Sequence, residues 1–255
     1  MKRYIYIAFV VLAGFLYSCN KSSDSSEMSP SIGGGDGPGV GGSMAKFTIA
    51  NDHLFLINET ELLIYNIINE ASPVEVGNLE VEFGIETVFS MGSKLFIGSD
   101  DGVYIYDISN PASILYLSHY EHIRSCDPVV ANDSIAFSTL NSMSSCRWQM
   151  GANQLDVIDI RNIVDPQLIS SYNMEDPKGL GLDGIYLFVC NGASGMDIYD
   201  ISNPYNLNRV SGITGIDAYD VIIHNNILVL IGKDGLFQYN YDNINNLELL
   251  SNILF

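Results

Sequence analysis

A nine-residue stretch occurs twice, with small changes, in this 255-residue chain. Residues 103–111 read VYIYDISNP, and residues 196–204 read MDIYDISNP. The first half of each copy is typical of a β-strand, whose successive side chains point to opposite faces. The Asp and the Asn-Pro pair that follow favour a turn, because Asp bonds its own backbone and Asn-Pro favours turn entry. A strand and turn that recur at a fixed period indicate a repeat architecture.

Five copies of this signature can be aligned. Measured at the Asp or Asn that ends each strand, they are spaced by 41, 52, 41 and 40 residues, and these positions are Asn66, Asp107, Asp159, Asp200 and Asn240. Two short apolar runs precede each signature and another follows it, while no segment of this region has apolar residues at helical spacing. Four short strands per unit of about 41 residues predict the blade of a β-propeller. The predicted fold is therefore all-β, with five four-stranded blades.

The units resemble the LVIVD-repeat family, in which an apolar strand is followed by Asp-Ile-Ser-Asn-Pro and a further Pro-Val pair. The resemblance runs from Lys46 to about Phe255, and it is closest in the second, third and fourth units. It implies a β-propeller-like protein of a kind often found on bacterial lipoproteins, mostly without a defined activity.

Two ways of closing the propeller are compatible with the sequence. Propellers usually seal their ring by mixing strands from both termini in one blade, so residues 253–255 could pair with the region around Phe47. The alternative is an open arc that closes by dimerising.

The first 18 residues have the features of an export signal. Lys2 and Arg3 precede an uncharged, mostly apolar run over residues 4–18, which is shorter than the roughly 20 residues that a membrane-spanning helix needs. The run ends at Ser18-Cys19, which resembles the lipobox of bacterial lipoproteins. This resemblance implies that Cys19 carries acyl chains such as palmitate and becomes the new N-terminus. The alternative is an ordinary signal peptide with an incidental Cys.

The rest of the chain divides by composition into two parts. Residues 19–43 are rich in Ser, Gly and Pro, cannot bury enough apolar surface to fold, and are predicted to be a flexible tether. Residues 44–255 form one apolar, aromatic-rich block that suits a single all-β domain. By resemblance to lipoproteins that lack an inner-membrane retention acid after the Cys, Asn20 implies an outer-membrane location. Which face of that membrane the protein occupies stays open.

The charge of the chain excludes some classes of partner. Removal of Lys2 and Arg3 with the signal leaves 11 − 2 = 9 basic residues against 30 acidic ones, a net charge near −21. Such a charge argues against nucleic acid and against polybasic association with anionic lipid.

The 52-residue spacing reveals an insertion of about eleven residues in the third unit, near residues 141–152. It contains Arg147 and Trp148, which belong to the residue types most enriched at binding hot spots, in a loop carried by a rigid scaffold. They are therefore candidate binding residues. The alternative is that Trp148 packs onto its own blade.

Three cysteines remain beyond Cys19. Cys126 and Cys146 lie in the same unit, and a disulfide between them would fix the insertion in a compartment that permits oxidation. Cys190 ends an apolar run where other units have Gly or Ser, so it is predicted to be a small buried residue.

Charged residues begin the innermost predicted strands. These starts would crowd around one end of the central channel, and convergent charges in a concave site are a candidate ligand site. The alternative is a solvated channel mouth with structural ion pairs. The residues are Lys46, Glu86, Asp127, Lys178 and Asp220.

The sequence contains no nucleophile elbow, paired general acids or phosphate-binding glycine loop, so it indicates no catalytic residue and no cofactor. It indicates no metal site either, because His119 and His122 would point to opposite faces of a strand. The expected function is a non-catalytic binding scaffold at the cell envelope, held to the membrane by its lipid and engaging an unknown protein or glycan. The alternatives are a propeller hydrolase or lyase acting on envelope or dietary glycans, and a structural subunit of an envelope complex.

Overall fold

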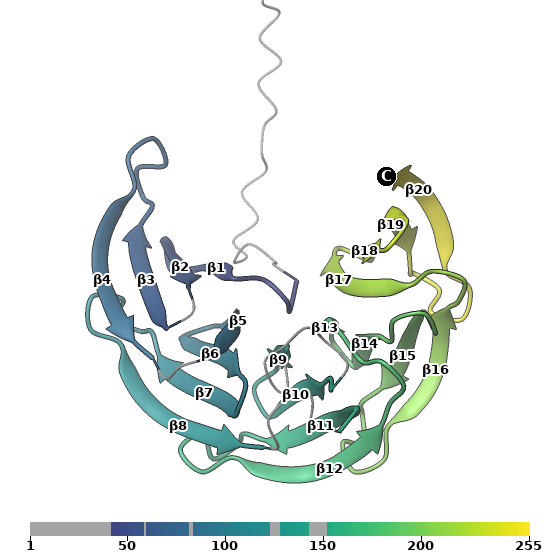
Figure 1. Ribbon diagram of the computed structural model, residues 1–255, viewed down its shortest axis with the longest axis horizontal. Helices are drawn as coiled ribbons and strands as arrows, with labels where there is room; N and C mark the ends of the chain where they lie inside the picture. The colour runs from purple at the N-terminus through teal and green to yellow at the C-terminus, as the bar shows by residue number, and fades with distance from the viewer. Residues whose placement is uncertain (1–41, 59, 82–83, 123–127, 143–151) are drawn as a thin grey trace, which may run out of the picture. The chain divides into compact units, whose positions relative to one another are not determined.

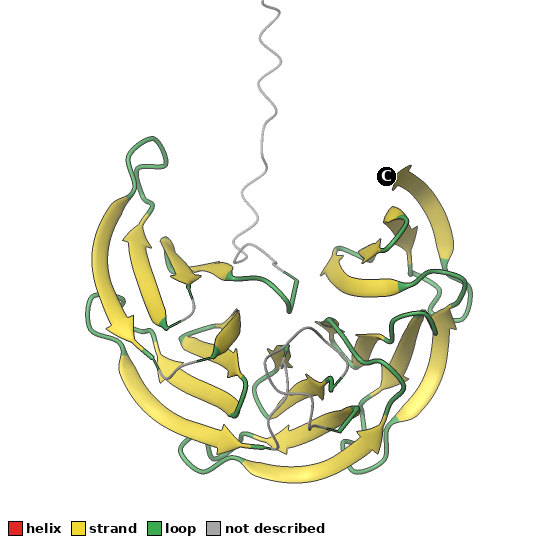
Figure 2. Ribbon diagram, viewed as in Figure 1, coloured by secondary structure: helices red, strands yellow, loops and turns green. Residues whose placement is uncertain are grey.

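The computed structural model describes residues 42–58, 60–81, 84–122, 128–142 and 152–255. The chain divides into two units, residues 1–36 and 37–255, and the described residues all lie in the second. They form β-strands joined by turns, as Figure 2 shows. Within these ranges no helix is long and apolar enough to cross a membrane.

In the described part of the chain, twenty strands form five antiparallel sheets, each built from four strands that are consecutive in the sequence. The sheets are called blades 1 to 5 in chain order. The five-bladed β-propeller expected from the repeats is confirmed (Figure 1). Blade 1 contains β1 (Phe47–Ala50), β2 (His53–Ile57), β3 (Glu61–Asn66) and β4 (Val74–Glu80); blade 2 contains β5 (Ile85–Met91), β6 (Lys94–Ser99), β7 (Gly102–Asp107) and β8 (Leu115–Glu121); blade 3 contains β9 (Val129–Ala131), β10 (Ile135–Leu140), β11 (Gln154–Asp159) and β12 (Gln167–Asn173); blade 4 contains β13 (Leu180–Asp183), β14 (Tyr186–Cys190), β15 (Met196–Asp200) and β16 (Asn208–Ile213); blade 5 contains β17 (Ala218–His224), β18 (Ile227–Gly232), β19 (Gly235–Asn240) and β20 (Glu248–Leu254).

The repeated Asp or Asn caps the turn after the third strand of each blade. Its side-chain oxygen accepts a hydrogen bond from the backbone N–H two residues later, as in Asp107 to Ser109 at 2.8 Å and Asp200 to Ser202 at 2.8 Å. The same bond forms at Asn66, Asp159 and Asn240. The Asp or Asn that occurs once in each blade therefore has a structural role, because its side chain shapes the turn.

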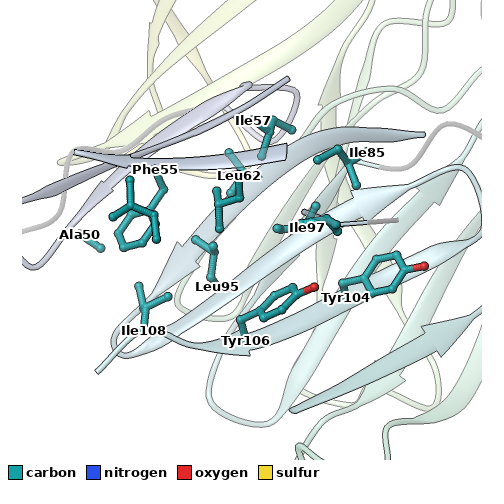
Figure 3. Packing of buried hydrophobic residues seen from close by; sticks show 13 residues of the cluster. Ala50, Phe55, Ile57, Leu62, Ile85, Leu95, Ile97, Tyr104, Tyr106 and Ile108 are labelled. Atoms are coloured by element: carbon teal, nitrogen blue, oxygen red, sulfur yellow. The ribbon is translucent and has the colours of Figure 1, made fainter. Parts of the chain in front are cut away.

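Neighbouring blades pack face to face. The forward face of a blade is defined here as the one toward the next blade in the sequence, and the backward face as the opposite one. A phenylalanine in the second strand of each of the first four blades lies on the forward face and is fully buried: Phe55, Phe96, Phe137 and Phe188. Figure 3 shows the first of these interfaces, where Phe55 and Leu62 of blade 1 pack with Leu95 and Tyr106 of blade 2. The core is thus a series of interblade layers rather than one central cluster.

The blades at the two ends of the chain do not share a sheet. Ile253 pairs with Leu236 in blade 5, whereas Phe47 pairs with Leu56 in blade 1. The suggestion that residues 253–255 pair with the region around Phe47 was therefore wrong. The innermost strands pack in the series β1, β5, β9, β13 and β17, and no comparable packing among the described residues joins β17 to β1. Blades 1 and 5 lie at the two ends of an arc in this unit (Figure 1).

Residues 42–45, called the strap here, tie the chain before β1 to the innermost strands of other blades. The carbonyl of Ala45 accepts from the N–H of Val88 in β5 at 3.0 Å. The hydroxyl of Ser43 accepts from the N–H of Leu180 in β13 at 2.5 Å and donates to Asp220 in β17 at 3.3 Å. The strap therefore connects blade 1 with blades 2, 4 and 5 without adding a strand to any of them.

Candidate functional site

Among the described charges predicted at the channel end, Asp220 is more buried than Glu86. Its carboxylate accepts from the backbone N–H of Val221 at 2.9 Å, and from the backbone and hydroxyl of Ser43 and the backbone of Met44. Burial raises the pKa of Asp220 to about 6, although these donors act in the opposite direction. The acceptor positions of this carboxylate are used by the strap and its own strand.

Two glycines make room for this carboxylate. A Cβ at Gly42 would collide with Asp220 Oδ2, and a Cβ at Gly179 would collide with Asp220 Oδ1. The strap and the residue before β13 therefore approach Asp220 more closely than a residue with a side chain could.

Lys178 lies close to the same end of the innermost strands. Its Nζ is 3.2 Å from Asp176 and 3.7 Å from Asp217, and it lies 4.4 Å from the centre of the Tyr219 ring. Asp176 also accepts from the side-chain amide of Asn141 at 2.7 Å. Lys178 is thus part of an ion-pair cluster contributed by blades 3, 4 and 5.

Lys46 and Glu86 form the second group of predicted channel charges. Burial raises the pKa of Glu86, the neighbouring Asp100 raises it further, and Lys46 lowers it. The structure thus places the four predicted charges that it describes in two groups, Lys46 with Glu86 and Lys178 with Asp220. Whether either group binds a ligand stays a prediction.

The remaining predicted residues are partly outside the described ranges. Asp127, the Cys126–Cys146 pair and the Arg147–Trp148 pair all lie outside the described residues, as does Cys19. Cys190 is described, and it is fully buried with a free thiol whose pKa burial raises. The prediction that Cys190 is a small buried residue is confirmed.

One feature that the sequence did not predict is the backward face of blade 1, which no blade built from the described residues covers. It carries six apolar or aromatic side chains, called the open face here: Phe47, Ile49, Leu54, Leu56, Leu63 and Tyr65. Phe47 is 52% exposed, whereas the residues in its register position in the other blades, Val88, Val129, Leu180 and Val221, are at most 2% exposed. The signal in the sequence is the alternation of side chains along each strand of blade 1, which puts apolar residues on both faces of its sheet.

The uncovered forward face of blade 5 is different in composition. Val229 stands where the other blades have the buried phenylalanine, and Gln238 stands where they have Ile64, Ile105, Val157 or Ile198. The side chain of Gln238 accepts a hydrogen bond from Ser251 of the same blade at 3.1 Å. Atypical terminal repeats are characteristic of repeat proteins, in which they cap the stack.

These blades and faces define the protein as a β-propeller of five four-stranded blades. The LVIVD repeat model matches residues 91–121, 150–174 and 178–213. The chain therefore carries LVIVD repeats on a β-propeller fold, as its repeats predicted. No protein of curated function matches the sequence.

Solved structures with a similar fold include proteins from three bacteria, one of which is named as a gluconolactonase. The chain matches a functionally unknown protein from Desulfotomaculum acetoxidans with a TM-score of 0.67 and 11% identity, over 82% of this chain and 69% of that one. It matches a protein from Lactobacillus plantarum with a TM-score of 0.64 and 14% identity, over 80% and 68% of the two chains. The periplasmic gluconolactonase PpgL of Pseudomonas aeruginosa matches with a TM-score of 0.60 and 13% identity, over 80% and 67%. At these identities the likeness shows the fold alone.

Proposed function

We propose that this protein is a non-catalytic interaction scaffold, anchored to the outer membrane of a bacterial cell envelope through acylated Cys19. The observation that carries the proposal is the open face of blade 1, where a sheet face with the composition of an interblade interface is left uncovered. Contiguous apolar surface that stays partly exposed, as here, is typical of interaction sites. The export signal and Cys19 support the envelope location, and residues 20–41 would supply the tether.

The charged groups at the channel end support a scaffold rather than an enzyme. Asp220 holds the strap, and Lys178 is paired with Asp176 and Asp217, so these groups serve the architecture of the propeller. The open face also favours the more specific role of a structural subunit in an envelope complex, because a subunit interface would cover it.

Fractionation of cells and capture of bound partners test this function together. We expect wild-type protein in the outer-membrane fraction and Cys19→Ala in the soluble fraction. Cys190→Ala is the matched control, because this buried thiol has no part in anchoring and the variant should stay with the membrane. Protein captured with its anchor should retain a protein or glycan at constant stoichiometry. Turnover of lactones or envelope glycans by the purified chain, or unchanged fractionation of Cys19→Ala, would contradict the proposal.

A further inference from the structure

The open face of blade 1 has the side chains of a face built to be covered. In blades 2 to 5 the backward face of the second strand is buried against the preceding blade, as with Leu95, Leu187 and Leu228. Leu54 and Leu56 occupy the matching positions in β2 and are only partly buried. Blade 1 therefore keeps the apolar pattern of the repeat on a side where the described residues supply no blade.

The four interfaces within the chain show which surface fits such a face. Each backward face packs against a forward face that presents a fully buried phenylalanine from the centre of its second strand, for example Phe188 against Leu228 and Leu230. Beside it lies an aliphatic residue of the third strand, such as Ile198. The complement of the open face is therefore a β-blade with an aromatic side chain at that position.

A second copy of this chain does not supply that complement. Its forward faces on blades 1 to 4 are already buried, so only the forward face of blade 5 is available. That face has Val229 and Gln238 at the two central positions, and Gln238 is bonded to Ser251. A further blade that followed β20 would pack against the same forward face of blade 5. It would meet Val229 and Gln238 there, in place of the phenylalanine and the aliphatic residue of the other interfaces.

We propose that the open face of blade 1 is a docking surface for a β-blade of another polypeptide, which presents an aromatic side chain from its second strand. This inference rests on the scaffold function proposed above and specifies its class of partner. The docked sheet covers Phe47, Leu54 and Leu56 as the neighbouring blades cover their counterparts.

A photo-crosslinking group placed on the open face tests the inference in the native cell. p-Benzoylphenylalanine replaces Phe47, an aromatic residue that is 52% exposed and is similar in shape to the probe. The matched control carries the same group at Ile253, which is 63% exposed on β20 of blade 5. We expect the Phe47 probe to yield an adduct with a different polypeptide, and the cross-linked peptide to come from a sequence of short strands repeating about every 41 residues. Leu56→Asp, or Leu56→Ser if the charge prevents folding, should lower that adduct at least tenfold.

Each other outcome overturns the inference. An adduct between two copies of this chain assigns the face to a dimer, and an adduct within one polypeptide assigns it to the chain itself. An adduct to a partner without β-repeats, or no adduct from a folded protein, removes the proposed partner class. A partner cross-linked at Ile253 and absent at Phe47 would contradict the docking surface while leaving the scaffold function intact.

Discussion

The hydroxyl of Ser43 donates a hydrogen bond to the carboxylate of Asp220 across 177 positions of sequence, at 3.3 Å. This contact joins the strap before blade 1 to the innermost strand of blade 5. Strands from the two termini do not share a blade, and among the described residues this bond links the segment before blade 1 to blade 5. The stability of the arc should therefore depend on Asp220 more than on other single carboxylates.

Replacing Asp220 tests that dependence. Asp220→Ala should lower the free energy of unfolding by about 2–4 kcal/mol, because it leaves buried N–H and O–H donors of the strap without an acceptor. Urea denaturation measures the change, and hydrogen exchange at Met44 and Val221 should rise with it. The control is Asp234→Ala, an exposed residue in the β18–β19 turn, which should change stability little. Equal effects of the two substitutions would contradict the role of the strap.

The pH dependence of stability should reveal the same carboxyl group. The pKa of Asp220 is raised from an ordinary value of 3.8 to about 6 in the folded protein, so the folded state binds the proton more tightly. The stabilising contribution is full below about pH 4 and is lost as the pH rises through 6, by roughly 3 kcal/mol in total. In Asp220→Asn the free energy of unfolding should not show this decrease between pH 4 and 6. Identical pH profiles for the wild type and Asp220→Asn would show that Asp220 does not titrate as its burial requires.

The phenylalanine at the centre of each interblade layer should carry much of the packing energy. Phe96→Ala removes a fully buried ring and should lower the free energy of unfolding by about 3–5 kcal/mol. Val229→Ala, at the same register position on the uncovered face of blade 5, should cost about 1 kcal/mol or less. Thermal and urea denaturation measure both. A loss at Val229 as large as that at Phe96 would show that the forward face of blade 5 is covered in the isolated chain.

The repeated turn residue should matter for stability and not for binding. Asn66→Ala removes the bond from the N–H of Ile68, 3.0 Å long, and should cost about 1 kcal/mol. Asn66→Asp keeps an acceptor of the same geometry, as Asp107 and Asp200 show in their own blades, and should remain close to the wild type. Both variants should retain the partner identified by capture, and loss of that partner in Asn66→Asp would indicate a role beyond the turn.

The sequence predicted the blades well because their determinants are local. The 41-residue spacings from Asn66 to Asp107 and from Asp159 to Asp200 define the period. The bond of each side chain to the following turn shows why the residue repeats. The alternation of apolar residues then determines which side chains point to each face of a sheet. The five sheets therefore follow from short-range patterns.

The ends of the arc and the strap could not be predicted in the same way. The contact of Ser43 with Asp220 depends on how five sheets stack, and no local pattern in the Gly-rich segment before Phe47 encodes it. The repeated motif also gives no sign that Val229 and Gln238 replace the phenylalanine and the aliphatic residue of the other blades. The fifth unit is recognisable by its turn, and these two residues lie on the strands before it. The sequence predicted one set of charges at the channel end, whereas the described charges fall into two groups whose surroundings depend on the strap and on burial.

The most direct test of the central claim is hydroxyl-radical labelling of Phe47 and Leu56, compared between the purified chain and the protein in intact envelopes. If the open face of blade 1 is an interaction surface, both side chains should be labelled in the purified chain and protected in the envelope, while the exposed Tyr205 is labelled equally in both. Equal labelling of Phe47 and Leu56 in the two preparations would contradict the account.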